Sequence, residues 1–392
     1  MSASSFVFQH STKVRFAPGA VKELGTELRM LGGHHVLVVC DEGIREIGIT
    51  DKVLGVLDEA DLDVDVFSAI SENPRDRECA EAAAAAKECG ADIIVGLGGG
   101  SAMDAAKAAA VLVTNGKRVQ DWDAPARLAR EPMPTVCVPT TSGTGSEVTF
   151  VSVITDDDRR YKMCIQDPAL SPRVAVADPE LTLSLSPGLT ASTGVDALTH
   201  AIEAYTCRLA EPVTDALALA AISLIASSLE AAVANGDDIE ARCNMMLGSL
   251  MAGVAFVNTD VGSVHCIAET LGGWYDIPHG IANAVFLADV LEFNYPADPV
   301  RHARVAGALG VDCSGMTAED ASMHGIAEIR RLTRSVGIPV FSELARVDPL
   351  EFEDLARAAA DHICTPSNAR DIGYEEYLGL LERAYVATAP EI

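Results

Sequence analysis

The chain has 392 residues, of which 49% are hydrophobic and 22% are charged. This length exceeds what one ordinary core requires, so two domains are expected, and the composition is that of a globular protein rather than a disordered one. The formal net charge of −28 argues against nucleic acid and anionic membranes as partners, because both would repel the protein. Such a charge indicates a solvated acidic surface, typical of adaptation to salt.

The cysteines and the N-terminus both favour a cytoplasmic protein. The ten cysteines are spread from Cys40 to Cys364 without a CxxC pair, as expected for reduced thiols. The first residues, MSASSFVFQHSTKVRF, lack the apolar core of a signal peptide. The apolar run Ala108–Val113 is too short to span a bilayer. We therefore expect neither export nor membrane insertion.

The first half of the chain alternates between strand and helix patterns. Short β-branched runs at Val36–Cys40, Ile93–Leu97 and Thr135–Val138 are typical of buried strands. The alanine-rich segment Cys79–Cys89 between the first two is typical of a helix. Strands separated by helices of this length predict a parallel, doubly wound sheet.

The pattern changes after Asp178-Pro179, because amphipathic helical periodicity then replaces the strand runs. The expected helices are Ala191–Tyr205, Val213–Ala234, Asp238–Val257, Thr317–Val336 and Tyr374–Ala387. We expect a domain boundary near Ser186-Pro187, where proline would interrupt regular structure. The prediction is an α/β dinucleotide-binding domain over residues 1–186 and an all-helical, metal-binding domain over residues 187–392.

Two loops after predicted strands are candidates for binding a nucleotide. The segment Gly96–Ser101 (GLGGGS) precedes a helix expected to begin near Ala102, where exposed amides attract phosphate oxygens. It is not a complete GxGxxG fingerprint, so a tight turn explains it equally well. The segment Pro139–Glu147 (PTTSGTGSE) adds hydroxyl groups after the next strand. Two polar loops at the carboxyl ends of parallel strands favour a ligand site.

Asp41 ends the strand run Val36–Cys40. A carboxylate there can accept a hydrogen bond from a ribose 2′-hydroxyl and repel a 2′-phosphate, which favours NAD(H) over NADP(H). Aspartate at a strand end is also common in turns.

A candidate metal site comes from the helical half. Asp196 and His200 are four residues apart, which places both on one face of a helix. His265 and His279 follow, fourteen residues apart. One carboxylate and three imidazoles suit Fe²⁺ or Zn²⁺ and suit Ca²⁺ poorly. Each feature alone is common in structural roles, but three of the nine histidines fall together with the carboxylate in one apolar region.

With these residues the chain resembles the iron-dependent (group III) alcohol dehydrogenase family. The resemblance rests on GGGSAMDAAK (98–107), PTTSGTGSEVT (139–149), YKM (161–163), ADPELT (177–182), TGVDALTHAIEAY (193–205) and YDIPHGIANA (275–284). With the weaker SENP (71–74) and CTPSNAR (364–370), these stretches cover nearly the whole chain in the order and spacing of the family.

The resemblance implies an NAD-dependent alcohol dehydrogenase or aldehyde reductase with a cleft between its two domains. It assigns the metal, Fe²⁺ or alternatively Zn²⁺, to Asp196, His200, His265 and His279. It assigns the NAD(H) site to Asp41, Asn73, Gly99, Gly100, Ser101, Asp104, Thr140, Thr141, Thr149, Lys162 and Leu181. The expected partner is a small alcohol or aldehyde, and a homodimer or larger assembly is expected, with the strand around Phe6–Arg15 as a candidate contact.

One position departs from the family pattern. The family usually has a second histidine four residues after the third metal ligand, and this chain has Glu269 there. Glu269 could move protons if burial raised its pKa, become a fifth metal ligand, or contact a cationic or polyhydroxylated substrate. It could equally form only a hydrogen bond. The four alternatives stay open, and Glu269 is the one candidate catalytic side chain.

Two other functions are compatible with this architecture. A sugar-phosphate cyclase such as dehydroquinate synthase also uses NAD and a metal, but it is a lyase and needs a basic pocket for its phosphate. Residues 189–290 contain few lysines and arginines, which disfavours it. A non-catalytic derivative of the fold would have lost metal ligands, and all four are present.

Overall fold

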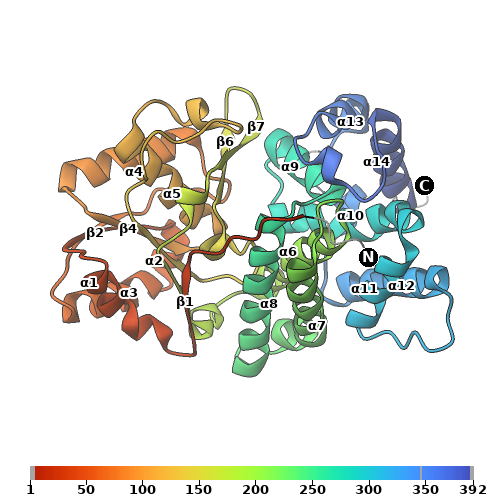
Figure 1. Cartoon of the computed structure of the whole chain (residues 1–392), viewed down its shortest axis with the longest axis horizontal. Coiled ribbons are helices and arrows are strands. Elements are labelled where there is room, and N and C mark those ends of the chain that lie inside the picture. The colour runs from red at the N-terminus through yellow and green to blue at the C-terminus, as the bar shows by residue number, and fades with distance from the viewer. Residues whose placement is uncertain (1–4, 345–346, 389–392) are drawn as a thin grey trace. The chain divides into compact units, whose positions relative to one another are not determined.

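A computed structural model describes residues 5–344 and 347–388 (Figure 1). The chain divides into two units, His10–Leu185 with Asp237–Met246, and Ser186–Gly236 with Leu247–Ile392 and the N-terminal nine residues. The first unit is α/β and the second is helical, so the predicted fold class is confirmed.

The α/β unit is built on a six-stranded parallel sheet with the order β1-β8-β5-β4-β2-β3. Its strands are β1 (Lys13–Phe16), β2 (His35–Val39), β3 (Asp63–Phe67), β4 (Ile93–Gly98), β5 (Thr135–Pro139) and β8 (Val174–Ala177). The three strands expected from β-branched runs are present, within a residue or two of their expected ends. The strand expected around Phe6–Arg15 is present only at its end, as β1, and β3 and β8 were not predicted, because β8 is short and β3 carries charged residues. A separate antiparallel hairpin joins β6 (Val151–Asp156) to β7 (Tyr161–Gln166).

Helices cover both faces of this sheet (Figure 1). One core packs α4 and α5 against residues such as Leu37 and Ile94, and the other packs α1 and α3 against residues such as Val38 and Val95. The helices are α1 (Leu24–Met30), α2 (Glu42–Glu46), α3 (Ile49–Glu59), α4 (Asp76–Cys89) and α5 (Gly100–Asn115). The alternation of alanine-rich helices with buried strands therefore produces the expected doubly wound layers.

The helical unit contains α6 (Pro187–Thr206), α7 (Pro212–Ala234), most of α8 (Ile239–Asn258), α9 (Ser263–Tyr275), α10 (His279–Asn294), α11 (Pro299–Ala308), α12 (Ala318–Ser335), α13 (Phe352–Ala360) and α14 (Tyr374–Thr388). Pro187 does not interrupt regular structure. It is the first residue of α6, where its missing N–H is not needed, and the Ser186 side chain caps the helix by accepting from Leu189 N.

Helix α7 has the length and apolar composition of a membrane span, with a mean hydropathy of 2.0 over its most apolar window. Length and composition alone do not assign a span, because the core helix of a globular unit has the same properties. Here α7 packs against α6 and α11, and its buried face includes Ala221, Ile225 and Leu229.

Candidate active site

Helix α6 contributes the first two residues of the candidate metal centre. Asp196 and His200 are one helical turn apart and both are buried, with Asp196 Oδ1 3.8 Å from His200 Nδ1. The imidazole of His200 also stacks on Phe256 from α8, with ring centroids 4.4 Å apart. The predicted helical spacing therefore brings both side chains to the same point.

Helices α9 and α10 contribute His265 and His279. His279 is the first residue of α10, and Gly280 follows it. A Cβ atom on Gly280 would lie 2.5 Å from the carbonyl oxygen of Ser192, so only glycine lets α10 begin this close to α6. The close approach leaves His279 Nε2 3.6 Å from Asp196 Oδ1.

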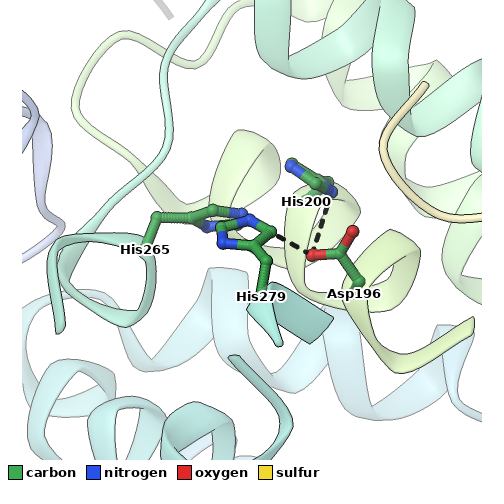
Figure 2. A group of neighbouring side chains, drawn as sticks. All are labelled: Asp196, His200, His265 and His279. Atoms are coloured by element: carbon green, nitrogen blue, oxygen red, sulfur yellow. Dashed lines mark ion pairs between the residues drawn. The ribbon is translucent and has the colours of Figure 1, made fainter. Parts of the chain in front are cut away.

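The four side chains form one cluster, with a ligand atom from each lying within 4.8 Å of the other three. Figure 2 shows them converging from three helices, with Asp196 facing both His200 and His279. His200 Nδ1 is buried and has no hydrogen-bond partner among the residues that the structure describes. A buried imidazole nitrogen left without a partner beside a carboxylate fits a site that holds a cation, and this donor set suits iron or zinc.

Burial prepares His200 to act as a ligand. Desolvation lowers its pKa to about 4, despite the opposing charge of Asp196. The imidazole is therefore neutral at pH 7, which is the state that binds a metal.

Glu203 supports the cluster and was not among the site residues predicted from the sequence. It lies one turn beyond His200 on α6 and is buried. Its Oε2 accepts from His265 Nδ1 at 2.6 Å, and its two oxygens also accept from Gly262 N and Val264 N at the start of α9. Burial lowers the pKa of His265, but Glu203 outweighs it and the pKa is raised. A carboxylate behind a histidine fixes which ring nitrogen faces the metal. The positions 196, 200 and 203 share one helix face, and this spacing was the available signal.

Asn283 is a second supporting residue that was not predicted from the sequence. Its Nδ2 donates to Asp196 Oδ1 at 2.7 Å and lies 3.2 Å from His265 Nε2 and 3.1 Å from His279 Nε2. Three atoms of the cluster therefore surround one buried amide nitrogen. Asn283 stands four residues after His279 on α10, so helical spacing was again the available signal.

Glu269 is paired with a histidine from a distant segment. His362 Nε2 lies 2.8 Å from Glu269 Oε2, and both side chains are mostly buried. Burial alone would lower the pKa of His362, but the charge of Glu269 and contacts with Cys266 raise it to about 11. The two residues therefore form an ion pair at neutral pH. His362 lies 93 residues away in sequence, so no local pattern identifies it.

In the α/β unit, the two predicted nucleotide loops touch each other. Gly99 is the N-cap of α5, and Gly100 is its first residue, two positions before the expected start. A Cβ atom on Gly100 would lie 2.6 Å from Thr144, and one on Gly99 would lie 3.5 Å from Thr141. The hydroxyls of Thr140 and Ser142 are buried and have no hydrogen-bond partner within residues 5–344 and 347–388. Unpartnered hydroxyls beside a helix N-terminus fit a polar ligand.

Asp41 lies at the same edge of the sheet. It caps α2 by accepting from Ile44 N at 2.9 Å. A Cβ atom on Gly98, whose φ is +146°, would lie 3.3 Å from Asp41 Oδ2. Asp41 thus serves as a helix cap beside the glycine turn.

Hydrogen bonds hold three further residues assigned to NAD(H), namely Asn73, Ser101 and Lys162. Lys162 Nζ donates to Asn73 Oδ1 at 3.0 Å, and Ser101 donates to the carbonyl oxygen of the neighbouring Glu72. These contacts join the segment around Asn73 to β7 and to the start of α5.

Asp104 and Thr149 belong to a buried network one turn further along α5. Asp104 Oδ1 accepts from Ser146 Oγ at 2.6 Å, and Lys107 Nζ donates to Thr149 Oγ1 at 3.1 Å. Leu181 is buried in the core of this unit and contributes packing.

Two family models cover most of the chain. The model described as "Iron-containing alcohol dehydrogenase" matches residues 11–179. The model described as "Fe-containing alcohol dehydrogenase family, C-terminal" matches residues 190–385.

Individual relatives match over nearly their full length. A NAD-dependent methanol dehydrogenase from Bacillus methanolicus is 40% identical over 93% of this chain and 96% of its own. A choline dehydrogenase from Bacillus subtilis is 36% identical over 97% of this chain and 95% of its own. The crystal structure of a 1,3-propanediol oxidoreductase is similar with a TM-score of 0.94 and 38% identity, over 97% of this chain and 100% of that one.

Proposed function

This chain belongs to the iron-containing alcohol dehydrogenase family, and on that premise we propose that its buried cluster of one aspartate and three histidines holds the catalytic metal. Its activity is that of an NAD(H)-dependent alcohol dehydrogenase or aldehyde reductase, which interconverts a small alcohol with its aldehyde or ketone. The observation that carries the proposal is the convergence of four ligand atoms within 4.8 Å, with Glu203 behind one of them.

A divalent iron held by this cluster supplies a Lewis acid for the substrate oxygen, and NAD(H) supplies or accepts the hydride. The protein's own contribution is to keep His200 neutral and to orient His265. Burial keeps His200 deprotonated, and Glu203 directs Nε2 of His265 toward the cluster by holding Nδ1. Zn²⁺ fits the same donors.

We assign NAD(H) to the polar edge of the α/β unit, where the loops at 98–101 and 140–146 meet. The unpartnered hydroxyls of Thr140 and Ser142 support this assignment, as does the N-terminus of α5. The carboxylate of Asp41 is the basis for choosing NAD(H) over NADP(H), because it would repel a 2′-phosphate.

For Glu269 we propose a role in proton transfer together with His362. A 2.8 Å contact between a carboxylate and an imidazole is a short path for a proton. The pairing also argues against Glu269 as a fifth metal ligand and as a contact for a cationic substrate. A carboxylate already held by a cation is a poor fifth metal ligand and a weak subsite for a cationic substrate.

The substrate class that we propose is a short, uncharged primary alcohol and its aldehyde. Methanol and 1,3-propanediol, which name two of the relatives, are short uncharged primary alcohols, whereas choline, which names a third, is a cation that also carries a primary hydroxyl group. Because Glu269 and His362 neutralise each other, the helical unit offers no excess charge at this pair to select an ionic substrate.

We further propose a cytoplasmic homo-oligomer in which the N-terminal segment contributes to the interface. Phe6 and Val7 are exposed, Val7 to 83%, which is unusual for adjacent apolar side chains. Gln9 N donates to Asn258 Oδ1 at 2.7 Å and ties this segment to α8.

The test is NADH oxidation by anaerobically purified protein, with Fe²⁺ or Zn²⁺ added, across short aldehydes that are neutral, hydroxylated, anionic or amino-bearing. We expect metal-dependent turnover that is fastest with a neutral aldehyde. His279→Ala should lose metal and turnover together, and full activity of that variant without metal would refute the assignment. Absence of turnover with NAD and metal both bound would favour the cyclase-like or non-catalytic alternative.

A further inference from the structure

Three potential metal ligands also meet in the α/β unit, on elements that do not contribute to the catalytic cluster. They are His35 at the start of β2, Asp65 in β3 and Cys89 at the end of α4. One ligand atom from each lies within 4.8 Å of the other two. His35 Nε2 and Asp65 Oδ2 are already 2.7 Å apart.

The topology explains why these residues meet. Strands β2 and β3 are parallel neighbours in which Leu37 is opposite Asp65, so His35 and Asp65 lie diagonally on the same face of the sheet. Helix α4 packs on that face and ends at Cys89. Two hydrogen-bonded strands and one packed helix therefore set the positions of the three side chains.

The surroundings leave the cluster accessible to a cation from solvent. The side chain of Asp65 is 53% exposed and that of His35 is 28% exposed. Cys89 is half-buried, and burial raises the pKa of its thiol. Strand β3 is at the edge of the sheet, where exposed acidic residues discourage pairing with other chains. That role accounts for an aspartate but gives no reason for an imidazole and a thiol beside it.

We propose that His35, Asp65 and Cys89 bind a zinc ion, with water as the fourth ligand. Nitrogen, carboxylate oxygen and thiolate sulfur are the ligands that zinc prefers in tetrahedral sites, whereas Mg²⁺ and Ca²⁺ avoid thiolates. Zinc–ligand bonds of about 2.0–2.3 Å correspond to ligand separations of about 3.3–3.8 Å, which side-chain rotation can reach from the present arrangement. Binding releases the proton of the Cys89 thiol to solvent. The ion would tie the end of α4 to the edge strand β3.

The chemistry of the two clusters gives a specific spectroscopic test. A thiolate-to-cobalt charge-transfer band requires a cysteine ligand. None of the four catalytic ligands is a cysteine, so such a band does not come from the catalytic cluster. Metal-free full-length protein is titrated with Co²⁺ while absorption and bound metal are measured. We expect two equivalents of cobalt and a thiolate band in the unaltered chain. In His279→Ala we expect one equivalent and the same band, which separates this site from the catalytic cluster.

Variants then assign the ligands. Cys89→Ser should lose the band and one equivalent of cobalt. His35→Asn should lower the cobalt affinity of this site, as reported by the band, by about tenfold or more. The matched controls are His34→Asn, which changes the neighbouring histidine, and Cys313→Ser, which changes a half-buried thiol in the helical unit. Both controls should keep the band. Absence of a thiolate band in the unaltered chain, or a band that survives Cys89→Ser, would overturn the proposal.

A second measurement covers the case in which Cys89→Ser does not fold. Alkylation of the unaltered protein is mapped by mass spectrometry with and without Zn²⁺. At a free zinc concentration about ten times the dissociation constant of the site, about a tenth of the sites stay unoccupied. Alkylation of Cys89 should therefore slow about tenfold. The alkylation rate of Cys313 should not change. Equal rates at Cys89 with and without zinc would contradict the site.

Discussion

Glu203 Oε2 lies 2.6 Å from Nδ1 of His265, and both residues are buried. The carboxylate holds the imidazole with its other nitrogen directed toward the cluster. Such contacts behind a metal ligand usually contribute about 10–100-fold to metal affinity. We therefore expect Glu203→Gln to weaken iron or zinc binding by about that factor, measured by competition with a chromophoric chelator.

Glu211 provides the matched control for this prediction. It is also buried, and its carboxylate also accepts from two backbone N–H groups, those of Val213 and Thr214. It contacts none of the metal ligands. Glu211→Gln should lose comparable thermal stability and keep its metal affinity. If both variants lose metal equally, the role of Glu203 is structural.

Glu269 and His362 should each stabilise the fold only when the other is present. Breaking a buried ion pair leaves an uncompensated charge, so Glu269→Gln and His362→Asn should each destabilise the fold by about 3 kcal/mol. Measuring urea unfolding for both single variants and the double variant gives the coupling energy directly. The double variant should lose much less than the sum.

The same pair predicts an effect on proton transfer. If it carries protons, the pH profile of kcat should change in both single variants, because each removes one of the two groups between which a proton would move. The exchanged variant, Glu269→His with His362→Glu, should restore stability and much of the turnover, because it keeps both groups in contact. Unchanged pH profiles with lowered stability would leave the pair with a structural role only.

The charge of Asp41 should determine the preference for NADH over NADPH. Because Asp41 caps α2, an alanine variant would lose the cap and the charge together. Asp41→Ser removes the charge and keeps a side chain that can cap. We expect Asp41→Ser to lower the ratio of kcat/KM for NADH to that for NADPH by about tenfold or more, a change of about 1.4 kcal/mol. A preference for NADPH in the unaltered enzyme would contradict the assignment.

The buried carboxyl group of Glu147 should make the protein less stable as pH rises. Burial raises its pKa from the ordinary value of 4.5 to about 7. Between these two values the folded protein holds a proton that the unfolded chain has released, so the free energy of unfolding falls as pH increases. Over that window the loss attributable to Glu147 is at most about 3 kcal/mol. Glu147→Gln should remove this dependence, as measured by urea unfolding at pH 5 and pH 8.

The contribution of Glu27 to the free energy of unfolding should change with pH in the opposite direction. Burial would raise its pKa, but hydrogen bonds and charges from Lys13 and Arg15 outweigh burial and lower it. Its contribution is therefore fully present above pH 4.5 and is lost as pH falls through the lower pKa of the folded state. The difference in unfolding free energy between the unaltered chain and Glu27→Gln should shrink below pH 4.5. If Glu147 and Glu27 variants change the pH profile in the same direction, one of the two assignments is wrong.

Local sequence patterns were enough to predict the architecture and the candidate ligands. The runs at 36–40, 93–97 and 135–138 are apolar enough to form central strands, and a parallel sheet follows from the helices between them. Asp196 and His200 could be paired from sequence because four residues make one helical turn. The glycine and hydroxyl loops could be placed at one edge because parallel strands end together.

The short strands and the supporting contacts could not be predicted in this way. Strand β3 contains Asp63 and Asp65, and its place at the sheet edge allows charges that a central strand would not tolerate. Glu203 and Asn283 lie near the ligands in sequence, yet their partners are on other helices.

Glu269 shows the limit most clearly. From the sequence, its carboxylate could have moved protons, bound the metal, contacted a substrate or formed only a hydrogen bond. The fold brings His362 to 2.8 Å from it across 93 residues, and the two side chains form an ion pair. Sequence spacing determines which side chains share a helix face or a strand end, because those distances follow from helix and strand geometry. Contacts between distant segments depend on how the helices pack, and packing is a property of the whole folded chain.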